Sequence, residues 1–231
     1  MKSNTEKQQG GYGFGTFQGV FTPSILTIIG VVMYLRFGWV LGNVGLTGSL
    51  ALVTIGVPEN DHFSAFAKAV LTSARERRNV LIVRQGETPP EDGYLDVWWR
   101  GGGNNGALML SLAVLLRRDD FWKRHPLRIN MLVHSRTPEE AGRQLNDFLF
   151  QARIEAKTRI LETDGQPFTR VLSQNSTDAA MTFVGLRPPC DDETAASYGN
   201  YLEHLTHELS DVPAPIYVMS ANGIDLSRIF T

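Results

Sequence analysis

Backbone polar groups inside an apolar segment are the first feature of this sequence that could do chemistry. Residues 20–41 carry almost no charge, and Pro23 and Gly30 interrupt them midway. Pro23 removes a backbone donor, and Gly30 weakens helix continuation. A helix broken in this way presents amides that attract anions and carbonyls that coordinate cations, provided that they line a protein cavity. The pattern is typical of an ion site; a kinked span packed on a partner is the alternative.

Three other motifs are weaker. Gly101–Gly106 follows a predicted strand and precedes a predicted helix, where helix amides could hold a phosphate, but it lacks the full spacing of a nucleotide motif, so a plain turn is favoured. His204 and His207 lie three apart without HExxH or a third ligand, which favours surface histidines and no metal site. Cys190, the single cysteine, lies among acids that do not activate a thiol. With no GxSxG elbow either, we expect no enzyme and no cofactor.

The element that must position the ion site is a membrane helix. Residues 20–41 number 22, and a span needs about 20. A signal peptide or a buried soluble helix is the alternative, but the apolar part begins late and contains Pro23, Arg36 and Trp39. We therefore predict an N-terminal tail at 1–15 and a transmembrane segment at 16–57, with the first span at 20–41.

A second apolar run, residues 45–57, has 13 residues and is too short to cross a bilayer unaided. It is interpreted as a partial second span. From Gln8 to Pro58 the one charged residue is Arg36, whereas charges recur every few residues afterwards. This shift predicts that a separate domain occupies 58–231.

That domain has the pattern of an α/β fold with a mainly parallel sheet. Apolar runs at Asn79–Arg84, Tyr94–Arg100, Leu127–Val133, Ile154–Leu161, Ala179–Leu186 and Ala214–Ser220 predict strands. They alternate with predicted helices at Ser64–Arg78, Ala107–Arg117, Thr137–Gln151 and Glu193–Leu209. Thr137 followed by Pro138 is a helix-start signal.

Overall charge limits the partners. A formal net charge of -2 and a pI near 6.2 argue against nucleic acid. A basic cluster between Arg117 and Arg128 is either a solvated corner or a contact with anionic lipid.

Segments in two parts of the chain, the predicted first span and the predicted α/β domain, resemble one family. Gly15–Leu46 (GTFQGVFTPSILTIIGVVMYLRFGWVLGNVGL) is similar to the first transmembrane helix of the cation-chloride cotransporters, within the amino acid–polyamine–organocation superfamily. Leu95–Val133 (LDVWWRGGGNNGALMLSLAVLLRRDDFWKRHPLRINMLV) resembles the cytosolic carboxy-terminal domain of the same family. Val171–Leu186 and Tyr201–Phe230 resemble the last strands and helix of that domain. Most of the family's spans have no counterpart here, so the chain is interpreted as an internally truncated member.

The resemblance implies roles for residues of the first span. Backbone amides of Gly30, Val31 and Val32 would face chloride, and carbonyls near Thr27 and Ile28 would face potassium. Leu26 and Ile29 would approach sodium, if sodium is used. Arg36 would be the gate arginine, although its acidic partner is missing from this chain.

The resemblance also implies fold and function. The expected fold is a universal-stress-protein-like cytosolic α/β domain, preceded by one discontinuous transmembrane helix and a partial second one. The expected function is that of a symporter of chloride with potassium and/or sodium, integral to the cell membrane and in contact with lipid. Its cytoplasmic domain would be regulatory and would form a homodimer, and the truncated chain would not transport alone. A membrane-anchored α/β interaction module and a nucleotide-binding stress-type domain are the alternatives.

Overall fold

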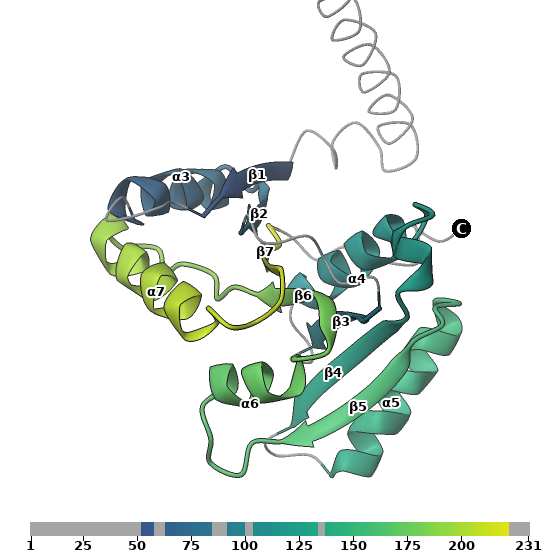
Figure 1. Cartoon of the computed structure of the whole chain (residues 1–231). Coiled ribbons are helices and arrows are strands. Elements are labelled where there is room, and N and C mark those ends of the chain that lie inside the picture. Colours follow the sequence, from purple (N-terminus) through teal and green to yellow (C-terminus); the bar gives the residue numbers. More distant parts are fainter. Residues whose placement is uncertain (1–51, 58–62, 85–91, 100–103, 134–136, 222–231) are drawn as a thin grey trace, which may run out of the picture. The chain divides into compact units, whose positions relative to one another are not determined.

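The computed structural model describes residues 52–57, 63–84, 92–99, 104–133 and 137–221, all within the second of two units of the chain, Leu50–Thr231 (Figure 1). The first span at 20–41, and with it the N-terminal tail, lies outside the described residues. In chain order the elements are β1 (Leu52–Gly56), α3 (Phe63–Arg75), β2 (Asn79–Val83), β3 (Tyr94–Trp99), α4 (Asn104–Leu116), the 3₁₀ turn η2 (Trp122–Arg124), β4 (Leu127–Val133), α5 (Pro138–Gln151), β5 (Lys157–Glu162), α6 (Phe168–Asn175), β6 (Ala179–Gly185), α7 (Ala195–Glu208) and β7 (Pro215–Met219).

A seven-stranded sheet forms the centre of the domain, in the order β1-β2-β7-β6-β3-β4-β5. β2 pairs antiparallel with β7, and all other neighbours are parallel. Strands β4 and β7 are buried at every position, as continuous apolar runs covered on both faces should be. The prediction of an α/β domain with a mainly parallel sheet is therefore confirmed.

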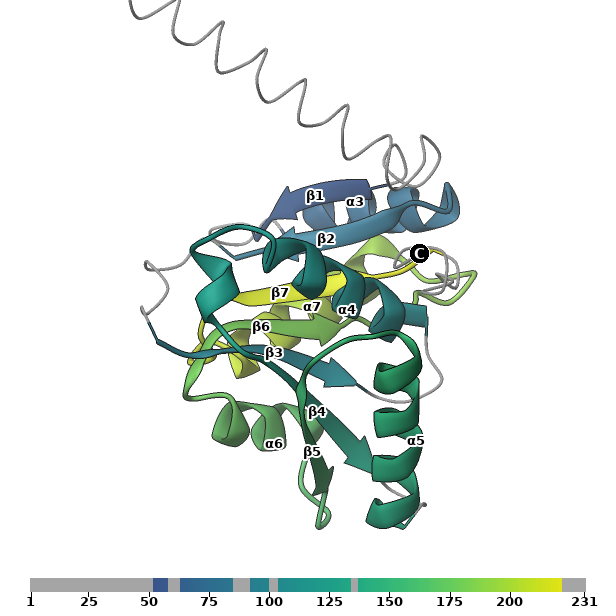
Figure 2. The ribbon, with the colours of Figure 1, turned by 90° about the vertical axis from the view of Figure 1, so that its right-hand side faces the viewer.

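Helices cover both faces of the sheet. Figures 1 and 2 show α4 and α5 on one face and α3, α6 and α7 on the other. Each interface has its own apolar core: Trp98, Val184 and Tyr217 belong to the core beneath α3, α6 and α7, whereas Val97 and Phe183 belong to the core beneath α4 and α5. The strand alternation of period two sends successive residues to opposite cores.

Residues 52–56 differ from the interpretation as part of a second span. They form β1, which pairs parallel with β2 from Leu52↔Asn79 to Gly56↔Val83. A short apolar run without alternation suits either a buried strand or a helix, and periodicity alone does not separate the two. The run is a strand because it pairs with β2, whose residues lie 27 positions later in the chain.

Several local boundaries also differ. α4 begins at Asn104, so the second half of the expected turn Gly101–Gly106 is helical. α6 was not expected, and β5 begins later than the predicted Ile154. α5 begins at Pro138 as predicted, although the Thr137 side chain makes no capping hydrogen bond. Among the described residues, no helix is both long enough and apolar enough to cross a bilayer.

Candidate functional site

The predicted ion site falls outside the part of the chain that the structure describes. This holds for all of its residues, Leu26, Thr27, Ile28, Ile29, Gly30, Val31 and Val32, and for the gate residue Arg36. The geometry available for a site is therefore that of the α/β domain.

The Gly-rich segment after β3 is tied down by protein groups where it is described. The Asn105 side chain donates to the Leu186 carbonyl at 2.6 Å and accepts from the Ser220 backbone amide at 2.7 Å. Gly106 lets α4 approach β3, because a Cβ there would come within 2.9 Å of the Trp99 ring. Asn105 thus cross-links the ends of β6 and β7, and its side chain is used internally.

The histidine pair and the single cysteine are surface features, whereas the two tryptophans of β3 pack against other rings. His204 Nδ1 lies 3.3 Å from a Glu208 carboxylate oxygen on the same exposed helix face. Within the described ranges, no group of three or more His, Cys, Asp or Glu side chains is placed to hold a metal ion. Cys190 is a free, exposed thiol. The two tryptophans of β3 lie on opposite faces of the sheet, Trp98 against Phe168 and Trp99 against Phe148.

A buried ion-pair network at the start of β3 and β4 is the polar site that the sequence reasoning missed. Asp96 is fully buried, and Arg128, opposite it in the β3–β4 register, is 5% exposed. The guanidinium donates from Nε and Nη2 to the two Asp96 oxygens at 2.7 and 2.8 Å. It also donates from Nη1 and Nη2 to Asp178 at 2.9 and 2.6 Å. One cation therefore serves two carboxylates with bidentate geometry.

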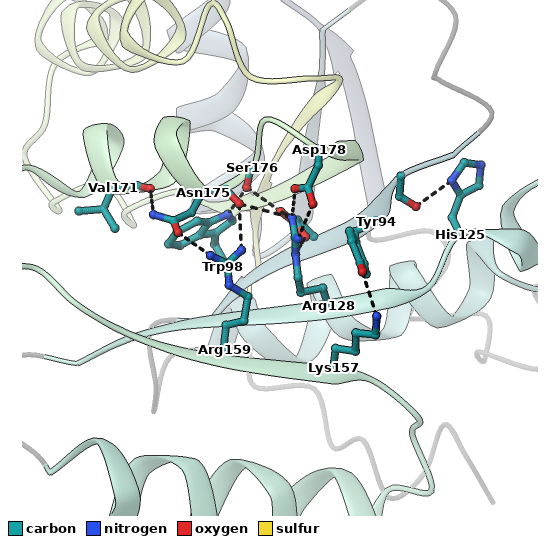
Figure 3. Close-up of polar contacts among 12 residues, drawn as sticks. Tyr94, Trp98, His125, Arg128, Lys157, Arg159, Val171, Asn175, Ser176 and Asp178 are labelled. Carbon is teal, nitrogen blue, oxygen red and sulfur yellow. Dashed lines mark hydrogen bonds and ion pairs between the residues drawn. The ribbon is translucent and has the colours of Figure 1, made fainter.

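Hydrogen bonds extend the network beneath α6 (Figure 3). Ser176 donates its hydroxyl to Asp96 at 2.6 Å and accepts from the Trp98 indole at 2.9 Å. Arg159 of β5 donates to both oxygens of Asn175, the side-chain oxygen at 2.6 Å and the backbone carbonyl at 3.2 Å. The segment 175–178, between α6 and β6, is thereby fastened to three strands.

A tyrosine covers the outer side of the network. The Tyr94 ring lies 4.1 Å from the Arg128 guanidinium carbon and 4.9 Å from Lys157 Nζ, and its hydroxyl accepts from that ammonium at 2.9 Å. Cations over an aromatic face are attracted by its quadrupole. This ring limits the access of water to the buried guanidinium.

The network changes the titration of its members. Burial raises the pKa of the Asp96 carboxyl, and hydrogen bonds from Arg128 and Ser176 act against that rise. The hydrogen bond from Arg128 lowers the pKa of the more exposed Asp178. Burial favours a neutral Arg128, yet the two carboxylates raise its pKa above the ordinary value. Arg128 therefore stays charged, and its carboxylate partners offset the cost of burying it.

The position of the network indicates a structural role. Asp96, Arg128 and Asp178 lie at the amino ends of parallel strands, whereas open α/β sheets bind ligands beyond the carboxyl ends. The guanidinium is already occupied by protein acceptors. Arg128 therefore acts as a structural cross-link that holds the segment between α6 and β6 against β3 and β4. The sequence does contain an indication of this pair: each of two largely apolar strands carries a single charged residue, Asp96 in YLDVWW and Arg128 in LRINMLV.

Short stretches of this chain are similar to curated membrane cotransporters. Solute carrier family 12 member 8 of Mus musculus is 50% identical over 44 residues, which is 19% of this chain and 6% of the relative. Cation-chloride cotransporter 1 of Oryza sativa subsp. japonica is 46% identical over 41 residues, 18% of this chain and 4% of the relative. The vacuolar cation-chloride cotransporter 1 of Saccharomyces cerevisiae is 32% identical over 63 residues, 27% and 6% respectively. These matches cover only a small fraction of each relative's length.

Solved structures resemble the α/β domain. The cytoplasmic domain of a prokaryotic cation chloride cotransporter superposes with a TM-score of 0.57 at 16% identity, over 78% of this chain and 67% of that one. A universal stress protein from Archaeoglobus fulgidus superposes less well, with a TM-score of 0.49, and the universal-stress-protein-like part of the fold expectation stays a prediction.

No family model matches the chain. The likeness in sequence and the likeness in fold are nevertheless independent observations, and both lead to the same group of proteins. The chain is thus similar to cation-chloride cotransporters in short stretches of sequence, and its α/β domain has the fold of the cytoplasmic domain of one of them.

Proposed function

We propose that this chain is a cation-chloride symporter-like membrane protein, related to symporters of chloride with potassium and/or sodium, and that its α/β domain is a cytosolic regulatory module. The observation that carries the proposal is the coincidence of two likenesses in one chain. One is 50% sequence identity over 44 residues with solute carrier family 12 member 8, and the other is the fold of the cytoplasmic domain of a prokaryotic cation chloride cotransporter. The proposed membrane location and ions rest on the family resemblance of Gly15–Leu46.

We infer further that the chain does not transport ions alone. The one predicted span, residues 20–41, cannot by itself enclose a water-excluding ion site, and an intramembrane arginine such as Arg36 is costly without its partner. The test is chloride-dependent rubidium uptake by liposomes that contain only this chain. Uptake equal to that of empty liposomes is expected; chloride-dependent uptake above that level would contradict the inference.

The second part of the proposal is homodimerisation through the α/β domain. The sheet ends on both sides in strands with one partner each among the described residues, β1 and β5, and such edges are common association surfaces. Light scattering of the detergent-solubilised full chain should give twice the polypeptide mass of 25.7 kDa. A monomer at high concentration would count against dimerisation and leave the family assignment untouched.

The chain would be integral to the cell membrane, in contact with lipid and inorganic ions, and would bind no nucleic acid. It would not be an enzyme and would need no cofactor. A nucleotide-binding role for the Gly-rich segment predicts a thermal shift with ATP, and no shift at millimolar ATP would remove that alternative.

A further inference from the structure

A cavity of about 220 Å³ lies apart from the buried network, at the opposite ends of the parallel strands. Its walls come from the end of α3, the loop that follows β6 and the residues that end β7. β6 and β7 are parallel, so the cavity lies beyond two neighbouring carboxyl ends. This is the edge where open α/β sheets bind ligands.

The wall formed by the loop after β6 is preorganised. Glu193 accepts a hydrogen bond from Arg187 Nη1 at 2.7 Å and another from the Cys190 backbone amide at 3.1 Å. The Arg187 guanidinium also lies over the Tyr201 ring, 4.5 Å from its centre. Pro188 and Pro189, which line the cavity, restrict the same loop further. A ligand would therefore meet a wall that needs little ordering.

The floor is fixed as well. Met219, Ser220 and Ala221 line the cavity at the end of β7. Two asparagine side chains hold the backbone there: Asn105 Oδ1 accepts from Ser220 N at 2.7 Å, and Asn79 Oδ1 accepts from Ala221 N at 2.9 Å. The cavity is thus formed before any ligand arrives.

The charges around the cavity select the kind of ligand. Arg75 and Arg78 line one wall, and the apolar side chains of Leu71 and Met219 line the interior. Arg78 Nε is paired with Glu76 at 2.8 Å, but both side chains are about half exposed, and such pairs are weak enough to exchange for a ligand. Arginines bind carboxylate and phosphate groups with matching geometry.

Asp191 also lines the cavity and limits the charge that the ligand can carry. A second anionic group placed near this carboxylate would be repelled, as like charges are at short distance. The volume of about 220 Å³ is also below the usual range for drug-sized ligands.

We propose that this cavity binds a small organic anion with one carboxylate or phosphate head. Arg75 and Arg78 hold the head, and a short apolar body lies against Leu71 and Met219. The site lies within the α/β domain, and the proposal does not depend on transport.

The single cysteine offers a direct assay, because Cys190 is exposed and lines the cavity. The rate of its alkylation by iodoacetamide, a neutral reagent, is measured on the detergent-solubilised full chain with increasing benzoate or phenyl phosphate. A ligand bound in the cavity would lie beside Cys190 and block the approach of the reagent, so saturable slowing of about five-fold is expected with at least one of the two anions. Their relative potency distinguishes a carboxylate from a phosphate site. Benzyl alcohol, which has a similar body and no charge, should protect far less.

Variants connect the protection to the two arginines. In the double variant Arg75→Gln/Arg78→Gln, the anion should no longer slow the alkylation of Cys190. In Arg75→Lys/Arg78→Lys, part of this protection should remain. Lys68→Gln is the matched control, since it removes one positive charge from the same helix at an exposed position away from the cavity. The proposal is overturned if neither anion protects, if benzyl alcohol protects equally, or if protection persists in the glutamine double variant.

Discussion

Replacing Arg128 by methionine removes the cation that Asp96 and Asp178 share. The methionine fills similar space, but Asp96 is then left fully buried without its partner. Breaking a buried ion pair from one side costs about 3–5 kcal/mol, because a charge stays in the interior uncompensated. Domains of ordinary stability have about 5–15 kcal/mol in total, so Arg128→Met should remove a large fraction of the free energy of unfolding.

Two further variants separate the pair from its surroundings. Asp178→Asn removes the partner whose side chain is 58% exposed, and it should cost at most about 1 kcal/mol. Arg128→Met combined with Asp96→Leu removes both buried charges. Apolar replacements of a buried pair are often neutral, so the double variant should regain most of the loss.

Urea unfolding of the full chain, followed by tryptophan emission, measures these differences. The pH dependence gives an independent signature. Burial already raises the pKa of Asp96, and without the opposing ion pair to Arg128 the folded pKa should rise further above the ordinary value of 3.8. The penalty should then be largest at neutral pH and shrink as pH falls toward 3.8. The reasoning is refuted if Arg128→Met costs no more than Asp178→Asn, or if its penalty is independent of pH.

Three further predictions rest on single contacts. Gly106→Ala should destabilise the domain, because a Cβ 2.9 Å from the Trp99 ring adds about 1–3 kcal/mol of overpacking against a helix-propensity gain of about 1 kcal/mol; a stabilised variant in urea unfolding would contradict this. Arg187→Met should return the pKa of Glu193 from about 2 toward its ordinary 4.5, because the hydrogen bond from Arg187 lowers it, and NMR titration of the Glu193 side chain measures this change. In the unsubstituted chain, the stability that Glu193 contributes above pH 4.5 is lost as pH falls toward 2, and this pH dependence should disappear in the variant. Asn105→Ala should cost about 1–3 kcal/mol by removing the side chain that bonds the Leu186 carbonyl and the Ser220 amide just after β6 and β7. Amide exchange at Ser220 should accelerate, and unchanged exchange would argue against the cross-link.

Much of the sheet could be predicted from local sequence. Leu127–Val133 is an apolar run that folds as the buried strand β4 with the predicted bounds, and Thr137-Pro138 predicts the start of α5. Such elements are specified by the spacing of apolar residues and by backbone preferences within one segment. The Gly-rich segment was less well predicted, since Asn104–Gly106 is helical. Packing of α4 against Trp99 overrides the low helix propensity of Gly106.

The sequence by itself determined that a weakly charged segment precedes an α/β domain, because composition and periodicity are properties of neighbouring residues. Only the tertiary structure decided that Leu52–Gly56 is a strand, that β2 and β7 run antiparallel, and that Asp96 and Arg128 meet. Each of these depends on partners distant in sequence: Asp96 and Arg128 are 32 positions apart, and Ser176 is 80 positions beyond Asp96. A charge inside an apolar strand is stable only with a partner in reach, and folding alone determines which residue that is.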